Sequence, residues 1–210
     1  MSNYYLLSID VGLINLALVY SLISSDHVLI KILKVHLINI TDYQHCTCSL
    51  SHEKTISNYM KHLFKEYGHL FNDVIIVELQ PITGLVAVEQ IICYEYPNTI
   101  RVSPRQMHCY FSINNLDYEA RKIKTVEIAE NLLRDITDYE RYNELIRKHD
   151  IADAVCIMLY YLSSVRETVI NKKSEQRLKH QLDLLKNKHF VTDDDSLNMF
   201  QNYAYNPEKS

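Results

Sequence analysis

The sequence predicts an α/β fold built on a mixed five-stranded sheet, with three antiparallel strands first, then two parallel strands, and helices on both faces. Three observations support this prediction. Apolar runs dominate residues 4–38, a continuous apolar run fills 73–79, and helical spacing of apolar residues recurs from residue 51 onward. Strands that follow each other directly favour antiparallel pairing, whereas strands separated by a helix favour parallel pairing.

The first three strands are predicted at the N-terminus. Residues 4–11 and 15–23 have the Leu, Ile, Val and Tyr content of a β-hairpin. Residues 27–38 predict a third strand with partial alternation, in which Lys31 and Lys34 point outward. Together these residues predict an antiparallel meander.

Helices and strands alternate in the middle of the chain. Residues 51–67 carry a helical apolar stripe that ends before Gly68. The run DVIIVEL at 73–79 predicts a strand buried on both faces, as in parallel pairing. A second helix is expected over 83–95 and a fifth strand over 98–102.

The remaining core elements are predicted to be helices. Ser103–Pro104 predicts a helix start, with serine as the cap and proline in the first turn. Asp117 is expected to cap a helix over 118–134, and Thr137-x-x-Glu140 resembles a capping box. The helix over 149–164 is apolar nearly all round, which predicts an internal position.

Length and charge limit the classes of protein. With 210 residues, we expect one domain over 1–165, followed at 166–210 by a charged helix and a disordered tail. A formal net charge of −4 argues against binding of polyanions through bulk charge. A nucleic-acid site would therefore be a local basic patch, or would be bridged to phosphate by a divalent metal.

The cysteines and the first apolar run indicate the compartment. Five cysteines show no paired framework, which favours a reducing intracellular setting. Asp10 lies within the N-terminal apolar run, which argues against a membrane segment. His45-Cys46-x-Cys48 with His52 has a poor spacing for zinc, so a reduced loop is favoured there.

Four carboxylates stand in otherwise apolar segments: Asp10, Glu78, Asp150 and Asp153. An unpaired buried carboxylate loses its hydration, so each of them needs a donor, a cation or a metal. Asp150 and Asp153 share one face of a helix because they are three residues apart. Each also has a structural alternative: Asp10 capping the hairpin turn, Glu78 at a solvated strand end, Asp150 as a helix N-cap and Asp153 on a plain helix face.

Taken together, the four carboxylates predict a metal site. Like charges brought close raise one another's pKa, so such a group stays ionised mainly where cations neutralise it. Oxygen ligands favour Mg²⁺ or Mn²⁺ over zinc. Two such ions about 4 Å apart are the arrangement that cleaves phosphodiesters.

Three segments resemble the active-site motifs of the RuvC-like Holliday junction resolvases, in the poxvirus branch of that family. The segments are SIDVGLINLA, IIVELQP and KHDIADA, and the likeness spans residues 5–162. The order of elements likewise resembles the ribonuclease H-like arrangement. The resemblance implies a homodimeric, Mg²⁺-dependent endonuclease (Mn²⁺ substituting) that nicks a four-way DNA junction symmetrically.

The resemblance also implies roles for single residues. Asp10, Glu78, Asp150 and Asp153 would be both catalytic residues and ligands of two metal ions per active site. His149 would orient a water or a phosphate, although capping or packing is an equal alternative. No nucleotide cofactor and no membrane are implied, and a viral origin would place the protein at cytoplasmic replication sites or in the virion. Bacterial relatives have an aromatic wedge after the glutamate motif, where this chain has Pro81-Ile82-Thr83-Gly84-Leu85.

Candidate DNA contacts and a candidate dimer face complete the predictions. The DNA-contact set is Arg105, Arg121, Lys122, Lys124, Lys148, His149 and Gln80. Helix-start amides near residue 121 would add to phosphate binding, whereas a plain solvated helix face is the alternative. The spare apolar surface of the helix after Glu78 predicts a dimer face formed by Leu85, Val86, Val88, Ile91 and Ile92.

Three other functions are weighed against junction resolution. A nuclease for RNA–DNA hybrids, or a transposase-like enzyme, would share the fold and carboxylates but differ in substrate. The Asp-x-Gly hairpin resembles that of actin-like and Hsp70-like ATPases, but three glycines in the chain give poor support for phosphate loops. A DNA-binding module without activity would not need four mutually repelling acids.

Overall fold

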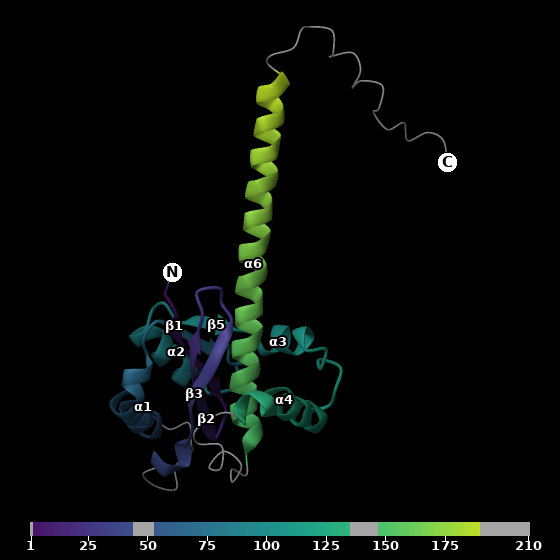
Figure 1. Cartoon of the computed structure of the whole chain (residues 1–210). Helices are drawn as coiled ribbons and strands as arrows, with labels where there is room; N and C mark the ends of the chain where they lie inside the picture. Colours follow the sequence, from purple (N-terminus) through teal and green to yellow (C-terminus); the bar gives the residue numbers. More distant parts are fainter. Residues whose placement is uncertain (1, 44–52, 135–146, 190–210) are drawn as a thin grey trace. The chain divides into compact units, whose positions relative to one another are not determined.

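Five strands form one mixed sheet in this computed structural model, which describes residues 2–43, 53–134 and 147–189, with side chains at 2–43, 54–134 and 147–183. The order across the sheet is β3-β2-β1-β4-β5 (Figure 1). The strands are β1 (Tyr4–Val11), β2 (Asn15–Ile23), β3 (Leu29–Asn39), β4 (Val74–Glu78) and β5 (Ile100–Val102). β1 and β3 both pair antiparallel with β2, whereas β1–β4 and β4–β5 pair parallel. The predicted fold class is confirmed.

The helices follow the predicted order. They are α1 (Glu53–Tyr67), α2 (Val86–Glu95), α3 (Pro104–Tyr110), α4 (Tyr118–Leu133) and α6 (Lys148–His189), with short 3₁₀ turns at Ile40–Tyr43 and Gly68–Leu70. Asp117 accepts a hydrogen bond of 2.8 Å from the Ala120 backbone N–H, which confirms the predicted cap of α4. Ser103 precedes α3 as predicted, but its side chain makes no capping hydrogen bond.

The alternation of β1 separates two hydrophobic cores, one on each face of the sheet. Leu6 belongs to the core that packs against α4 and the first part of α6, whereas Leu7 and Ile9 belong to the core under α1 and α2 (Figure 1). Ser8 faces α6 and donates a hydrogen bond of 2.7 Å to the Ala154 carbonyl. Asp10 follows with the same parity, so the strand pattern turns it toward α6.

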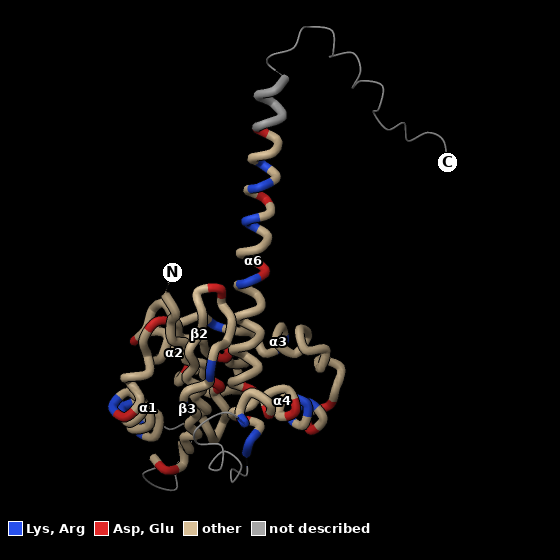
Figure 2. The backbone as a smooth tube through the Cα atoms, in the orientation of Figure 1, with Lys and Arg blue, Asp and Glu red and all other residues tan. Residues whose placement is uncertain are grey.

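The chain divides into two compact units, Met1–Arg166 and Glu167–Ser210. Within the first unit, α6 is apolar on the sides that meet the core, from Ile151 to Leu162. In the second unit the described side chains are nearly all exposed, with Lys, Arg, Asp and Glu along the helix (Figure 2). The separate domain roles of these parts stay a prediction. None of the helices in the described ranges combines the length and apolar character that a bilayer span requires.

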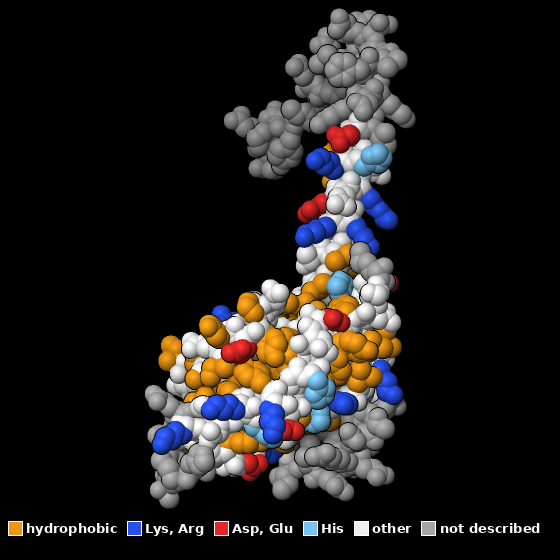
Figure 3. All heavy atoms as spheres, turned by 90° about the vertical axis from the view of Figure 1, so that its left-hand side faces the viewer, with side chains coloured by type: hydrophobic (Ala, Val, Ile, Leu, Met, Phe, Trp, Pro, Cys, Tyr) orange, Lys and Arg blue, Asp and Glu red, His pale blue; other side chains and the backbone are white. Residues whose placement is uncertain are grey.

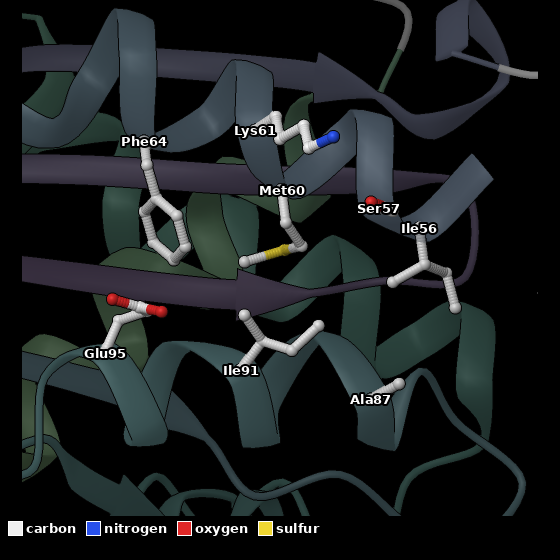
Figure 4. Close-up of a pocket in the computed structure, with 8 residues that line it drawn as sticks. All are labelled: Ile56, Ser57, Met60, Lys61, Phe64, Ala87, Ile91 and Glu95. Carbon is white, nitrogen blue, oxygen red and sulfur yellow. The ribbon is translucent and has the colours of Figure 1, made fainter. Parts of the chain in front are cut away.

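The predicted dimer face on α2 is wrong for most of its residues. Leu85, Val88 and Ile92 are only 7%, 0% and 0% exposed, because they fill the core between α2 and the sheet. Val86 and Ile91 are half-buried. Ile91 instead lines an open groove of about 430 Å³ between α1 and α2 (Figure 4), formed by Ile56, Ser57, Met60, Lys61, Phe64, Ala87, Ile91 and Glu95.

Hydrophobic side chains gather broadly on the side of the first unit that carries α1 and α2, with Lys and Arg toward one edge (Figure 3). Three predictions lie outside the described residues: the loop from His45 to His52, the capping box at Thr137 and Glu140, and the tail at 190–210.

Candidate active site

Two of the four predicted carboxylates meet on neighbouring parallel strands. Asp10 lies near the end of β1 and Glu78 ends β4, and the register Ile9 opposite Val77 makes them the next pair along. Both side chains lie on the face covered by α6, because their parity matches that of Leu6 on β1 and Ile76 on β4. The two carboxyl groups share a hydrogen bond, which requires that one of them holds a proton.

The other two carboxylates come from the first turns of α6. Asp150 is 5% exposed, and Asp153 is half-buried one turn later on the same side of the helix. Ile151, Ala154 and Val155 are fully buried and fix this part of α6 on the sheet, together with the hydrogen bond from Ser8. The helix therefore brings its two acids toward the sheet carboxylates.

The pKa values show that the four acids sense one another. Burial raises the pKa of Asp10 well above its usual value, and the negative charges of Glu78, Asp153 and Asp150 raise it further. Burial also raises the pKa of Asp153 to about 7; Glu78 and Asp150 add to this, while Thr125 and Lys122 oppose it. The pKa of Glu78 is raised by burial against opposing hydrogen bonds from Asp10 and Gln80. Acids from three distant segments thus form one electrostatic unit.

Asp150 differs from the other three because protein donors surround it. Its Oδ2 accepts hydrogen bonds of 2.9 Å from Arg147 Nε and 2.9 Å from Asn15 Nδ2. Arg147 reaches the other oxygen at 3.3 Å. The helix begins at Lys148, so Asp150 sits inside the first turn and is not the N-cap residue that the alternative interpretation proposed.

His149 lies beside this ion pair. Its Nε2 is 3.1 Å from Asp150 Oδ1 but is poorly aligned, and within the described part of the chain this buried nitrogen makes no hydrogen bond. Burial is the main cause that lowers the pKa of His149, which favours a neutral ring. A neutral imidazole with a free nitrogen is able to accept from or donate to a water or a phosphate.

A network behind Glu78 also supports the site. Gln80, predicted as a DNA contact, donates 2.7 Å from its side-chain amide to Glu78 Oε2. Its backbone N–H donates 2.7 Å to Glu89 Oε2, and Glu89 Oε1 lies 2.7 Å from Arg101 Nε. The loop after Gln80 exposes the aliphatic side chain of Ile82, which is 99% exposed.

The donor set fits a hard divalent cation, although the side chains are not arranged as ligands in this structure. Over the described ranges, no group of three or more His, Cys, Asp and Glu side chains stands in a metal-binding arrangement. The reason is local: Asp10 and Glu78 hydrogen-bond each other, and Asp150 is turned onto Arg147 and Asn15. Buried carboxylates with raised pKa values are the groups that a cation would relieve most.

The predicted basic residues divide into two groups. Lys122, Lys148 and His149 line one open hollow of about 470 Å³ beside the acids, together with Glu119, Ile123, Val126 and Glu127. Lys122 Nζ also lies 3.9 Å from the centroid of the Tyr118 ring.

The other basic residues have local partners or stand apart. Arg121 donates to the Leu116 carbonyl at 2.7 Å, and Lys124 pairs with Glu127 at 2.6 Å. Arg105 is exposed on α3. The basic set is therefore less concentrated than the sequence predicts, and the group beside the acids is its centre.

Three residues of this site were not predicted from the sequence: Asn15, Arg147 and Glu89. Asn15 and Glu89 are buried polar side chains, 5% and 3% exposed. Each interrupts an apolar run, LINLAL and LVAVEQII, which was the available signal. Arg147 precedes the KHDIADA motif and carries no such signal.

One protein family matches most of this chain. The family model described as Poxvirus A22 protein matches residues 5–167. No curated protein sequence matches the chain.

Solved structures share the fold. The fowlpox virus resolvase, solved with its substrate Holliday junction DNA, is 18% identical with a TM-score of 0.55, covering 77% of this chain and 99% of that one. The yeast mitochondrial Holliday junction resolvase Ydc2 is 17% identical with a TM-score of 0.56, covering 81% and 85%. Thermus thermophilus RuvC is 13% identical with a TM-score of 0.53, covering 79% and 97%.

Proposed function

The chain belongs to the family of poxvirus A22 proteins, and on that premise we propose that it is an endonuclease that resolves four-way DNA junctions with divalent metal ions. Membership of this family confirms the resemblance to poxvirus resolvases that the three sequence motifs indicate. The related fold of the fowlpox, yeast and Thermus resolvases gives the proposal its substrate class.

One observation carries the chemistry. Asp10 is buried, Glu78 and Asp153 are half-buried beside it, and all three have raised pKa values, with negative charges of Glu78 and Asp153 adding to burial at Asp10. Such a group would destabilise a purely structural core, because each negative charge makes ionisation of its neighbours less favourable. A site that binds cations gains from it, since the acids are held ready for the ion.

Each acid has a proposed role. Asp10 is central, because it hydrogen-bonds Glu78 and senses both helix acids, so we assign it the position between two Mg²⁺ ions. Glu78 and Asp153 would each hold one side, and Asp150 would complete the set when its carboxylate leaves Arg147. When bound, the ions supply an activated water and neutralise charge at the scissile phosphate. Mn²⁺ is expected to replace Mg²⁺ at oxygen ligands.

The basic hollow beside the acids fits the DNA backbone. Lys122 and Lys148 would pair with phosphates, and the free nitrogen of His149 would hold a phosphate oxygen or the attacking water. Arg105, Arg121 and Lys124 would extend the contact along the backbone. With a net charge of −4 this contact is local and involves few phosphates, so we expect the affinity for DNA to fall only shallowly with salt.

Two opposed nicks require two active sites, so we propose that the enzyme is a homodimer. The open groove between α1 and α2 and the apolar surface around it give a second copy a place to bind. Sedimentation of the full chain should give a dimer, and Ile91→Asp should give a monomer that still binds divalent cations. For its site of action, we propose cytoplasmic viral replication sites.

The experiment is cleavage of a synthetic mobile four-way junction with each strand labelled in turn. With Mg²⁺, the full chain should produce paired nicks at symmetric positions and leave matched linear duplex intact. Asp153→Asn should bind the junction as tightly as wild type and cut it at least about 10³-fold more slowly.

The competing nuclease function is tested in parallel. Cutting of an RNA–DNA hybrid without cutting of the junction would overturn the substrate assignment while leaving the carboxylate site in place. Junction binding without cutting by wild type in Mg²⁺ or Mn²⁺ would instead support the non-catalytic DNA-binding module.

A further inference from the structure

The Glu78 carboxylate is held by a chain of contacts that runs to a buried acid on α2. Gln80 donates 2.7 Å to Glu78 Oε2, and the Gln80 backbone N–H donates 2.7 Å to Glu89 Oε2. Glu89 is 3% exposed within an apolar helix, so it has lost nearly all contact with water. A buried carboxylate is costly unless donors satisfy it, and here its two oxygens meet two donors.

The second donor is Arg101 on β5. Its Nε lies 2.7 Å from Glu89 Oε1, and its side chain is half exposed. The guanidinium of Arg101 therefore neutralises the buried carboxylate of Glu89. The Arg101–Glu89 pair therefore links β5, α2 and the residue that supports Glu78.

Backbone hydrogen bonds in the loop from Leu79 to Gly84 help to hold Gln80 in this position. Leu79 N–H donates 2.8 Å to the Val102 carbonyl, and Gly84 N–H donates 2.8 Å to the Pro81 carbonyl. A Cβ placed on Gly84 would clash with Gln80 Oε1 and stand 3.2 Å from the Pro81 carbonyl oxygen. The absence of a side chain at Gly84 thus makes room for the Gln80 amide.

From these contacts we infer that Glu89 is a positioning residue that fixes Gln80, and through it the Glu78 carboxylate, for binding of the divalent cation. The inference rests on the proposed function, since Glu78 matters as a ligand only there. Glu89 is 3% exposed, so its side chain does not reach the surface on which DNA would bind. Its effect should therefore appear in cation affinity and not in junction binding.

The experiment measures Mn²⁺ affinity of the full chain by calorimetry without DNA, so it does not depend on cleavage. In Glu89→Gln the amide of the new side chain faces one of two N–H donors, so the contact to Gln80 or to Arg101 is lost. We expect Mn²⁺ affinity to fall about 10- to 100-fold, with junction binding in EDTA unchanged. Glu66→Gln, which changes an exposed acid on α1 outside the groove, is the control and should keep wild-type affinity.

Two further variants keep the test decisive if Glu89→Gln folds poorly. Gln80→Ala removes the link, and Gly84→Ala pushes the Gln80 side chain away from Glu78 without changing any charge; both should lower Mn²⁺ affinity about tenfold or more. If Glu89 acts through Gln80, the double variant Glu89→Gln/Gln80→Ala should bind Mn²⁺ no more weakly than the weaker single variant.

The outcomes separate the two proposals. Wild-type Mn²⁺ affinity in Gln80→Ala and Gly84→Ala, or fully additive losses in the double variant, would overturn the positioning role while leaving the metal site intact. Failure of the wild-type chain to bind Mn²⁺ at all would overturn the metal site and the positioning role together.

Discussion

The first turns of α6 carry two aspartates with opposite surroundings. Asp150 accepts hydrogen bonds from Arg147 and Asn15, so the protein itself compensates its charge. Asp153 lies one turn further on, and burial with neighbouring acids raises its pKa to about 7. Asp10 and Glu78 on the sheet share the situation of Asp153.

This difference in surroundings indicates which of the four acids depend on a bound cation to compensate their charge. A carboxylate already paired with arginine must give up that partner before it binds a metal, whereas a carboxylate held among other acids gains at once. Asp10, Glu78 and Asp153 are therefore expected to set the affinity of the site, and Asp150 to tune it.

The largest expected effect comes from a change at Asp10, the central member of the group formed by Asp10, Glu78 and Asp153. Asp10→Asn should lower junction cutting at least about 10³-fold, because the amide carries no charge for the cation. The same variant should unfold at a higher temperature than wild type in EDTA, since a buried acid has become neutral. Asp117→Asn is the matched control: asparagine caps α4 as well as aspartate, and cutting should not change. Lower stability of Asp10→Asn in EDTA would contradict this account.

The second effect is the dependence of stability on pH. The folded pKa of Asp153 is about 7, above the value near 3.8 of the free side chain, so the folded state binds more protons between these two values. Stability in EDTA should therefore fall as pH rises from about 4 to above 7, and this acid alone accounts for up to about 4 kcal/mol. Denaturant unfolding across pH 5 to 8 measures this fall.

The controls for the pH effect are one variant and one ion. In Asp153→Asn, stability should fall much less as pH rises. Mg²⁺ should raise the stability of the wild-type chain at high pH but should not raise that of the variant. An equal slope in wild type and Asp153→Asn would show that Asp153 titrates in its ordinary range.

A smaller effect tests the compensated acid. Arg147→Gln removes the cation from Asp150, whose side chain is 7% exposed, and should destabilise the fold by about 1–2 kcal/mol in EDTA, since Arg147 is itself 40% exposed. Stabilisation by Mg²⁺ should be larger in this variant than in wild type, because Asp150 now depends on the ion. Arg134→Gln breaks an exposed pair with Glu130 and should change stability by less than about 0.5 kcal/mol.

The smallest expected effect concerns the hydrogen bond that Asn15 on β2 donates to Asp150. Asn15→Ala removes the donor to Asp150 Oδ2 and should cost about 1 kcal/mol in stability. We expect a loss of cutting of a few-fold, well below that of Asp10→Asn. A loss as large as that of Asp10→Asn would place Asp150 among the acids that set cation affinity.

The sequence was sufficient for the fold class, and a local signal at each position singled out the four acids, whose role as metal ligands stays a prediction. An apolar surrounding marked Asp10, Glu78 and Asp153 as unusual. The partners of these acids carry weaker signals. Whether Gln80 faces DNA or Glu78 depends on a side-chain torsion and on the space left by Gly84, which periodicity does not encode.

The prediction of a dimer face on α2 was wrong for a related reason. Leu85, Val88 and Ile92 follow an apolar pattern that is the same for a helix covering a sheet and for a helix covering a second copy. Only the position of α2 over the sheet decides between the two. Arg147 was not predicted because an arginine before a helix is ordinary. Its role in the site depends on its contact with Asp150.

The central claim is that Asp10, Glu78 and Asp153 form one cation site, and Mn²⁺ binding by the full chain without DNA tests it most directly. The account predicts saturable binding that Asp10→Asn abolishes and that Glu78→Gln and Asp153→Asn each weaken at least about tenfold, with Asp117→Asn unchanged. Binding of Mn²⁺ at wild-type affinity by Asp10→Asn would contradict it.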